Sequence, residues 1–80
     1  MVTLNRRWTL VPGHGGSKWG LYAPKLVLRL RALIRFTGEK YFLKVWDETQ
    51  PERWLSCGEF DSLSEAKSIG RVMAQMRIPA

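Results

Sequence analysis

The stretch LRLRALIRF, residues 28–36, sets three arginines among the most apolar residues of the chain. Read as part of a strand over 25–36, it puts the even-numbered residues, all apolar, on one face, and Arg29, Arg31, Leu33 and Arg35 on the other. A helix is the alternative, since Pro24 suits a first turn and Gly38 a position just past the end. A helix would point Arg29 and Arg31 about 200° apart, whereas a strand gathers them. We therefore predict a strand.

Patterned runs separated by turn residues lie on both sides of this stretch. The loop over 12–18 is rich in Gly, and TGEK at 37–40 and ETQPE at 48–52 are typical turns or connections. The β-formers between these breaks predict further strands. The predicted strands are 2–11, a short one at 19–23, 25–36, 41–47 and 53–60.

The C-terminal residues predict one amphipathic helix, at about 62–77. Ser62 suits the N-cap, because its hydroxyl can accept from the backbone amide of Glu65, and Pro79 ends the pattern. Apolar residues then recur at spacings of three or four and predict the buried stripe of the helix. These residues are Leu63, Ala66, Ile69, Met73 and Met76.

We therefore predict a single α+β domain over residues 1–80, with an antiparallel sheet of three to five strands packed against the C-terminal helix. The apolar side of 25–36, with Tyr41, Leu43 and Val45, would face the helix. Two registers stay open for the last strand: it could turn either Trp54 and Phe60, or Leu55 and Cys57, toward the core.

Charge is unevenly distributed along the chain. The protein has 80 residues and a net charge of +6, and residues 1–38 hold seven basic residues and no acid, while residues 39–80 hold six basic and seven acidic residues. The two parts therefore carry +7 and −1, an asymmetry that favours a polyanionic partner. We expect a cytoplasmic protein that does not enter membranes, because Cys57 is alone and no apolar run approaches the roughly 18 residues of a membrane span.

The side of the sheet opposite the helix is the predicted binding surface. Arginines and lysines there could pair with phosphates, and aromatic rings could contact sugars or stack on bases. The structural alternatives are that the N-terminal strand covers this face, or that its arginines only prevent edge-to-edge aggregation. The predicted nucleic-acid-binding residues are Lys25, Arg29, Arg31, Arg35, Lys44 and Trp46, with Arg6, Arg7 and Lys18 as secondary contacts.

Residues 38–74 resemble the AP2-like DNA-binding domains, including the arm-binding domains of phage and transposon integrases. The resemblance rests on Gly38, the aromatic strand 41–46, the Gly58–Glu59–Phe60 strand end, and Ser62, Glu65 and Ala66 in an S-x-x-E-A helix start. It implies a three-stranded sheet that enters the major groove of duplex DNA, with Arg29, Arg31, Lys44 and Trp46 toward the DNA. A small phage or mobile-element DNA-binding protein is the function expected on this basis.

Catalysis and cofactor binding have little support in the sequence. His14 lies in a Gly-rich loop without a second His, Cys57 has no partner for a metal site, and no phosphate-loop pattern occurs. We expect no enzyme activity, no metal and no cofactor. The alternative function is a small phage-type inhibitor that docks on an acidic surface of a host protein complex, such as a polymerase or a CRISPR complex, through exposed Trp and Arg residues.

Overall fold

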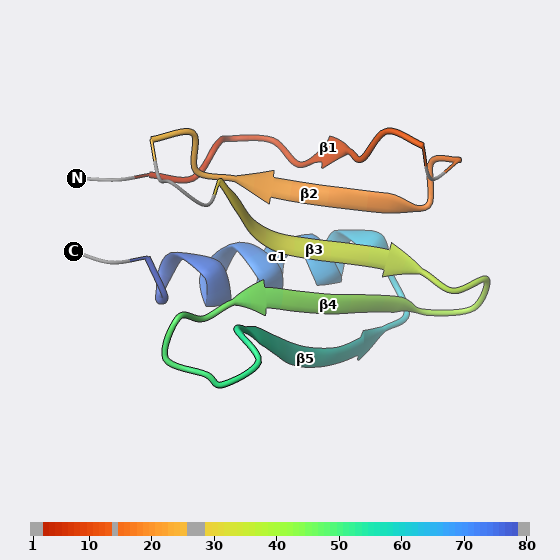
Figure 1. Ribbon diagram of the computed structural model, residues 1–80. Helices are drawn as coiled ribbons and strands as arrows, with labels where there is room; N and C mark the ends of the chain where they lie inside the picture. Colours follow the sequence, from red (N-terminus) through yellow and green to blue (C-terminus); the bar gives the residue numbers. More distant parts are fainter. Residues whose placement is uncertain (1–2, 14, 26–28, 79–80) are drawn as a thin grey trace.

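A five-stranded antiparallel sheet and one helix make up the part of the chain that the computed structural model describes, residues 3–13, 15–25 and 29–78 (Figure 1). Neighbours in sequence are neighbours in the sheet, whose order is β1-β2-β3-β4-β5. The predicted α+β fold is confirmed, and strand rather than helix is correct for 30–36; positions 14 and 26–28 lie outside the described residues. The elements are β1 (Thr9–Leu10), β2 (Lys18–Tyr22), β3 (Leu30–Phe36), β4 (Tyr41–Trp46), β5 (Trp54–Phe60) and α1 (Leu63–Gln75).

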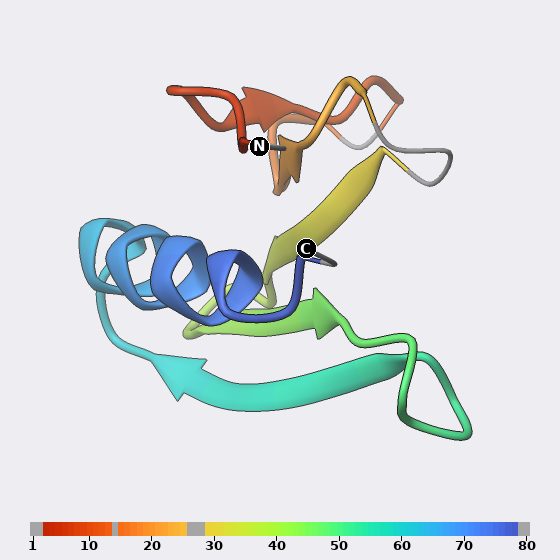
Figure 2. The ribbon, with the colours of Figure 1, turned by 90° about the vertical axis from the view of Figure 1, so that its left-hand side faces the viewer.

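The helix lies on one side of the sheet, and none of the described segments packs against the other side (Figures 1 and 2). We call the two sides the helix face and the open face. Strand alternation and the pairing register assign residues to each. The helix face carries the core, with Leu21, Ala32, Ile34, Leu43 and Val45 fully buried and Leu55, Cys57, Leu63 and Met73 packed around them.

A β-bulge at the start of β3 changes the predicted alternation. Tyr22 pairs with Leu30 and Leu21 pairs with Ala32, so Arg31 is an extra residue between two pairs. Leu30 therefore lies over Gly20 on the open face, where its Cδ1 would be 3.0 Å from a Cβ at that position. Arg31 turns to the helix face and is buried. The predicted sides of Leu30 and Arg31 were wrong, whereas residues 32–36 follow the predicted alternation.

A second bulge decides the register of β5. Phe42 pairs with Glu59 and Lys44 with Ser56, so Cys57 and Gly58 together oppose Leu43. Gly58 has φ +97°, a backbone conformation that L side chains rarely adopt. Because the bulge resets the alternation, Leu55, Cys57 and Phe60 all pack on the core. The register that turns Leu55 and Cys57 toward the core is therefore confirmed for both residues, whereas of the other pair only Phe60 faces the core and Trp54 does not.

The helix begins as predicted, with the Ser62 hydroxyl accepting from the Glu65 amide at 3.0 Å, and it buries part of the predicted stripe: Ala66 is buried, and Leu63 and Met73 pack against the core. Its fully buried residues are small, Ala66, Gly70 and Ala74, whereas Ile69 and Met76 are 37% and 73% exposed. The prediction that Ile69 and Met76 are core residues was wrong. The small residues let α1 approach the sheet closely.

The N-terminal segment packs on the helix side rather than over the open face. Leu4 is buried in the core, and a Cβ on Gly70 would be 2.8 Å from the Trp8 ring. The Arg71 guanidinium donates to the carbonyl oxygens of Asn5 and Arg6. The predicted strand 2–11 is therefore only the two residues of β1, and these contacts direct the segment away from the predicted binding surface.

Candidate nucleic-acid interface

The open face joins basic and aromatic side chains from four strands. Register places Lys18, Arg35 and Phe42 in one row across β2, β3 and β4, and Lys44 beside Leu33 in the next. Arg35, Phe42, Lys44 and Trp46 thus share a face, as the alternation predicted. The described residues of the face are Lys18, Gly20, Tyr22, Leu30, Leu33, Arg35, Phe42, Lys44, Trp46, Trp54, Ser56 and Glu59.

The predicted basic residues other than Arg31 divide into three groups. Arg35 and Lys44 are exposed on the open face, with half-buried Lys18 next to Arg35. Lys25 and Arg29 are exposed in the connection between β2 and β3. Arg6 and Arg7, also exposed, belong to the segment that Arg71 holds against α1. The structure therefore brings three of the predicted cations together on the sheet.

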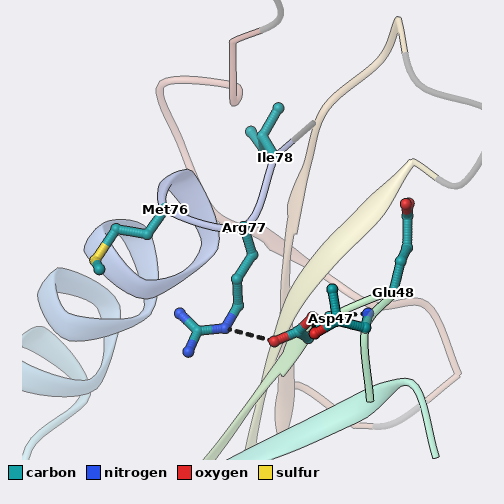
Figure 3. A pocket seen from close by; sticks show the side chains of 6 residues that line it. Asp47, Glu48, Met76, Arg77 and Ile78 are labelled. Carbon is teal, nitrogen blue, oxygen red and sulfur yellow. Dashed lines mark hydrogen bonds and ion pairs between the residues drawn. The ribbon is translucent and has the colours of Figure 1, made fainter. Parts of the chain in front are cut away.

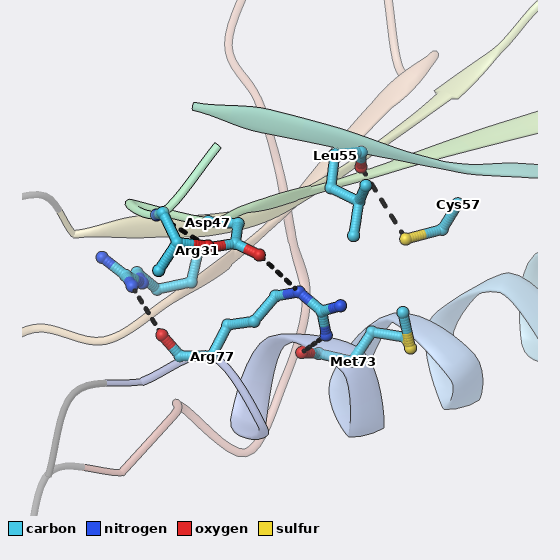
Figure 4. Close-up of polar contacts among 7 residues, drawn as sticks. Arg31, Asp47, Leu55, Cys57, Met73 and Arg77 are labelled. Atoms are coloured by element: carbon cyan, nitrogen blue, oxygen red, sulfur yellow. Dashed lines mark hydrogen bonds and ion pairs between the residues drawn. The ribbon is translucent and has the colours of Figure 1, made fainter. Parts of the chain in front are cut away.

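Arg31 is not part of this surface. Only 1% of the residue is exposed. Its guanidinium contacts Glu48 Oε1 at 3.4 Å and donates to the carbonyl oxygen of Arg77 at 3.3 Å, and Figure 4 shows the second contact. Helix C-termini leave carbonyl groups without intrahelical donors, and basic side chains commonly satisfy them. Arg31 ties the sheet to the residues that follow α1, so its predicted role in DNA contact was wrong.

The aromatic residues of the open face are half-buried, and within Trp46 the Nε1 atom is buried. Trp46 and Trp54 form an edge-to-face pair with centroids 5.3 Å apart and planes at 83°. The Arg35 guanidinium lies 5.7 Å from the centroid of the Phe42 ring, within cation–π range. The cations can pair with phosphates, and the rings can contact sugars or unstacked bases.

Beside the Trp pair, the β4–β5 loop forms a polar cluster with the end of α1. Asp47 accepts from the Thr49 hydroxyl at 2.6 Å, the Thr49 amide at 2.9 Å and Arg77 Nε at 3.1 Å (Figures 3 and 4). The two Thr49 donors, and then Arg77, lower the pKa of Asp47. Arg77 also donates to the Met73 carbonyl. These groups satisfy one another, so the shallow pocket they line with Glu48, Met76 and Ile78 is a joint between sheet and helix.

Sequence reasoning missed several residues of these two regions. Tyr22, Leu30 and Trp54 belong to the open face, and only alternation traced across both bulges could have found them. Asp47 and Thr49 carry a local signal, because Asp commonly accepts from the backbone two residues on in a turn. The partners Arg31 and Arg77 carry none, since they come from β3 and from beyond α1.

We also searched the described residues for a metal site, a reactive cysteine and a membrane-spanning helix. Among residues 3–13, 15–25 and 29–78, no three His, Cys, Asp or Glu side chains gather as a metal site would require. Burial raises the pKa of the Cys57 thiol, which disfavours the reactive thiolate. The 13 residues of α1 are too few to cross a membrane, and no described helix qualifies as a span.

Comparisons with protein-family models, curated proteins and solved structures gave no match to this chain. The resemblance of residues 38–74 to AP2-like domains is neither supported nor contradicted by them and stays a prediction.

Proposed function

We propose that this protein binds nucleic acid through the open face of its sheet. The observation that supports the proposal is one uncovered sheet surface on which Lys18, Arg35 and Lys44 lie among the half-buried aromatic residues Phe42, Trp46 and Trp54. The cations would neutralise phosphates, and the rings would contact sugars and bases.

The distribution of charge supports a polyanionic partner. Ion pairs in the described chain join Arg31 to Glu48, Lys40 to Asp61 and Arg77 to Asp47, and none of them uses a cation of the open face. Glu59, across from Phe42, is the one carboxylate among the residues of the face defined above. The net charge of +6 adds long-range attraction to phosphates, which salt screens.

The form of nucleic acid expected from the sequence was duplex DNA, with three arginines toward the groove. The burial of Arg31 leaves Arg35 on the face and Arg29 at its margin. Duplex binding then relies on Lys18, Arg35 and Lys44, with Lys25 and Arg29 nearby.

Salt dependence of binding tests the proposal. On a mixed-sequence duplex, log affinity should fall with log salt at about 0.9 per phosphate neutralised. Replacing Arg35 and Lys44 together by Ala should reduce that slope by about two contacts, as measured by fluorescence anisotropy across a NaCl series. The control is Lys67→Ala, because Lys67 lies on α1, on the opposite side of the sheet. An unchanged slope for the double variant, or an equal loss in the control, would contradict the proposed face.

A protein partner is the second candidate, favoured by the mixture of side chains on the same face. Leu33, Phe42 and Trp46 lie there among Arg35 and Lys44, and protein interfaces are likewise enriched in aromatic and Arg residues. A small inhibitor that docks on an acidic host protein would use this surface. A pull-down from host lysate with nuclease treatment separates the two functions. A stoichiometric protein band that survives the nuclease favours a protein partner, whereas a complex that the nuclease removes favours nucleic acid.

A further inference from the structure

We infer that the open face recognises unpaired bases, so that its preferred ligand is single-stranded nucleic acid rather than a duplex. This inference rests on the proposed function and specifies its ligand. It comes from the way in which the two bulges and the register sort the side chains along the strands.

The open face has a cationic end and an aromatic end. The row at one end contains Lys18, Arg35, Phe42 and Glu59, and the middle row contains Leu33, Lys44 and Ser56. At the other end Tyr22 pairs with Leu30, and Trp46 pairs with Trp54. Among the strand residues of the face, the cations therefore lie in two adjacent rows and the two indole rings in a third. The exposed Lys25 and Arg29 lie in the β2–β3 connection, beyond the Tyr22–Leu30 pair.

The bulges create this segregation. The β3 bulge removes the buried Arg31 from the aromatic end and leaves Leu30 beside Tyr22. The β5 bulge turns Phe60 to the core and leaves Trp54 opposite Trp46 on the open face. Without the β3 bulge, Arg31 would lie in the row of the indole rings, and without the β5 bulge, Leu55 rather than Trp54 would lie opposite Trp46.

The spacing of the rows suits a single strand of nucleotides. Lys44 and Trp46 are two residues apart on β4, and so about 7 Å apart along the strand. One nucleotide can therefore place its base against the indole of Trp46 while its phosphate meets the Lys44 ammonium. The chain of phosphates would then follow Lys44, Arg35 and Lys18 across the sheet.

Duplexes cannot use the aromatic end in the same way. Paired bases are stacked on one another, so that only their edges and the backbone are accessible, whereas unpaired bases can lie flat on aromatic rings. The planes of Trp46 and Trp54 stand at 83°, so a base stacked on one indole meets the edge or the face of the other. The two indole rings can therefore contact one unpaired base, whereas the bases of a duplex are paired and stacked and do not offer a free face to them.

The experiment compares one sequence in two forms. A labelled, unstructured oligonucleotide of about 12 nucleotides is titrated alone and as a duplex with its complement, by anisotropy at roughly 50 and 200 mM NaCl. We expect the single strand to bind at least about fivefold more tightly, since one stacked base corresponds to about 5- to 100-fold in affinity. This comparison uses the unmodified protein and needs no variant to fold.

Variants then separate stacking from charge. Trp46→Leu and Trp54→Leu should each weaken single-strand binding by about 5- to 100-fold while duplex binding changes by less than about twofold. Trp46→Phe should retain most of the affinity, because it keeps a ring. The matched control is Trp8→Phe, since Trp8 packs against Gly70 on the helix side.

The outcomes distinguish the inference from the proposed function. Equal or tighter duplex binding that does not depend on the two indoles overturns the inference and leaves the proposed function intact. Binding of neither form, or binding that Arg35→Ala and Lys44→Ala leave unchanged, overturns both.

Discussion

Arg31 is the residue whose surroundings most change the interpretation of this protein. Three arginines lie among apolar residues over 29–35, and the local sequence pattern predicts the same face of the strand for all three. In the folded chain, Arg35 lies on the surface near the Phe42 ring, whereas Arg31 is buried between Glu48 and the carbonyl of Arg77. A guanidinium is suited to this position because it has several donors in a fixed plane.

Replacing Arg31 by Met should destabilise the fold. The variant keeps the apolar stem but removes the donors to Arg77 and Glu48, and we expect the free energy of unfolding to fall by about 1–3 kcal/mol. Urea denaturation followed by Trp fluorescence measures this. Arg35→Met, at an exposed position of the same strand, should stay within about 0.5 kcal/mol of the unmodified protein. Equal stability of the two variants would show that the buried contacts of Arg31 have no net effect.

At the scale of the elements, two irregular strand positions determine the faces of the sheet. A one-residue shift moves every following side chain to the other face, so a bulge changes far more than its own site. The bulge in β5 depends on Gly58, at φ +97°, with nothing within 4 Å of where a Cβ would stand. The constraint at Gly58 is therefore backbone conformation and not packing.

Gly58→Ala isolates this backbone effect. Because the site is sterically open, the expected loss of about 1–2 kcal/mol in unfolding free energy comes from the left-handed conformation alone. Ser56→Ala, at an exposed position of the same strand, is the control and should have little effect. Urea denaturation of both variants gives the comparison, and a Gly58→Ala protein as stable as Ser56→Ala would mean that β5 can abandon its bulge.

At the scale of the whole molecule, contacts in the middle of α1 and just past its C-terminal end hold the helix to the N-terminal segment and to the sheet. In the middle of the helix, Arg71 donates to the carbonyl oxygen of Asn5, and the Trp8 ring packs against Gly70. At the C-terminal end, Arg77 bridges the Asp47 carboxylate of the β4–β5 loop and the Met73 carbonyl, while Arg31 donates to the Arg77 carbonyl (Figure 4). These contacts join segments up to 66 residues apart in the sequence.

Acid should loosen the C-terminal attachment through Asp47. The pKa of Asp47 is lowered in the folded protein by Thr49 and Arg77, so the folded state binds this proton less well than the unfolded chain. The resulting stability is present above the unfolded pKa and disappears as the pH falls through the folded value. Between about pH 5 and pH 2, the free energy of unfolding should therefore fall more for the unmodified protein than for Asp47→Asn. Parallel losses in urea denaturation at the two pH values would contradict this assignment.

Local sequence was sufficient for the elements and their order. Period-two alternation, Gly and Pro breaks and the Ser62 cap act over a few neighbouring residues, so the strands at 41–46 and 54–60 and the C-terminal helix could be predicted closely. The same alternation placed Arg35, Phe42, Lys44 and Trp46 on one face, because no bulge interrupts those parts of β3 and β4.

Only the tertiary structure decided which residues each face finally contains. Each of the bulges at Arg31 and Gly58 inserts one extra residue into a strand. Their positions depend on contacts with the helix, the β4–β5 loop and the core, so they cannot be located from the alternation of apolar and polar residues. Ala66, Gly70 and Ala74, rather than Ile69 and Met76, are the buried helix residues. Trp8 and Leu43 lie so close to Gly70 that a side chain there would clash with them. Periodicity predicts which residues of a strand or helix share a side. Tertiary packing determines which of those sides is buried and which remains exposed to a ligand.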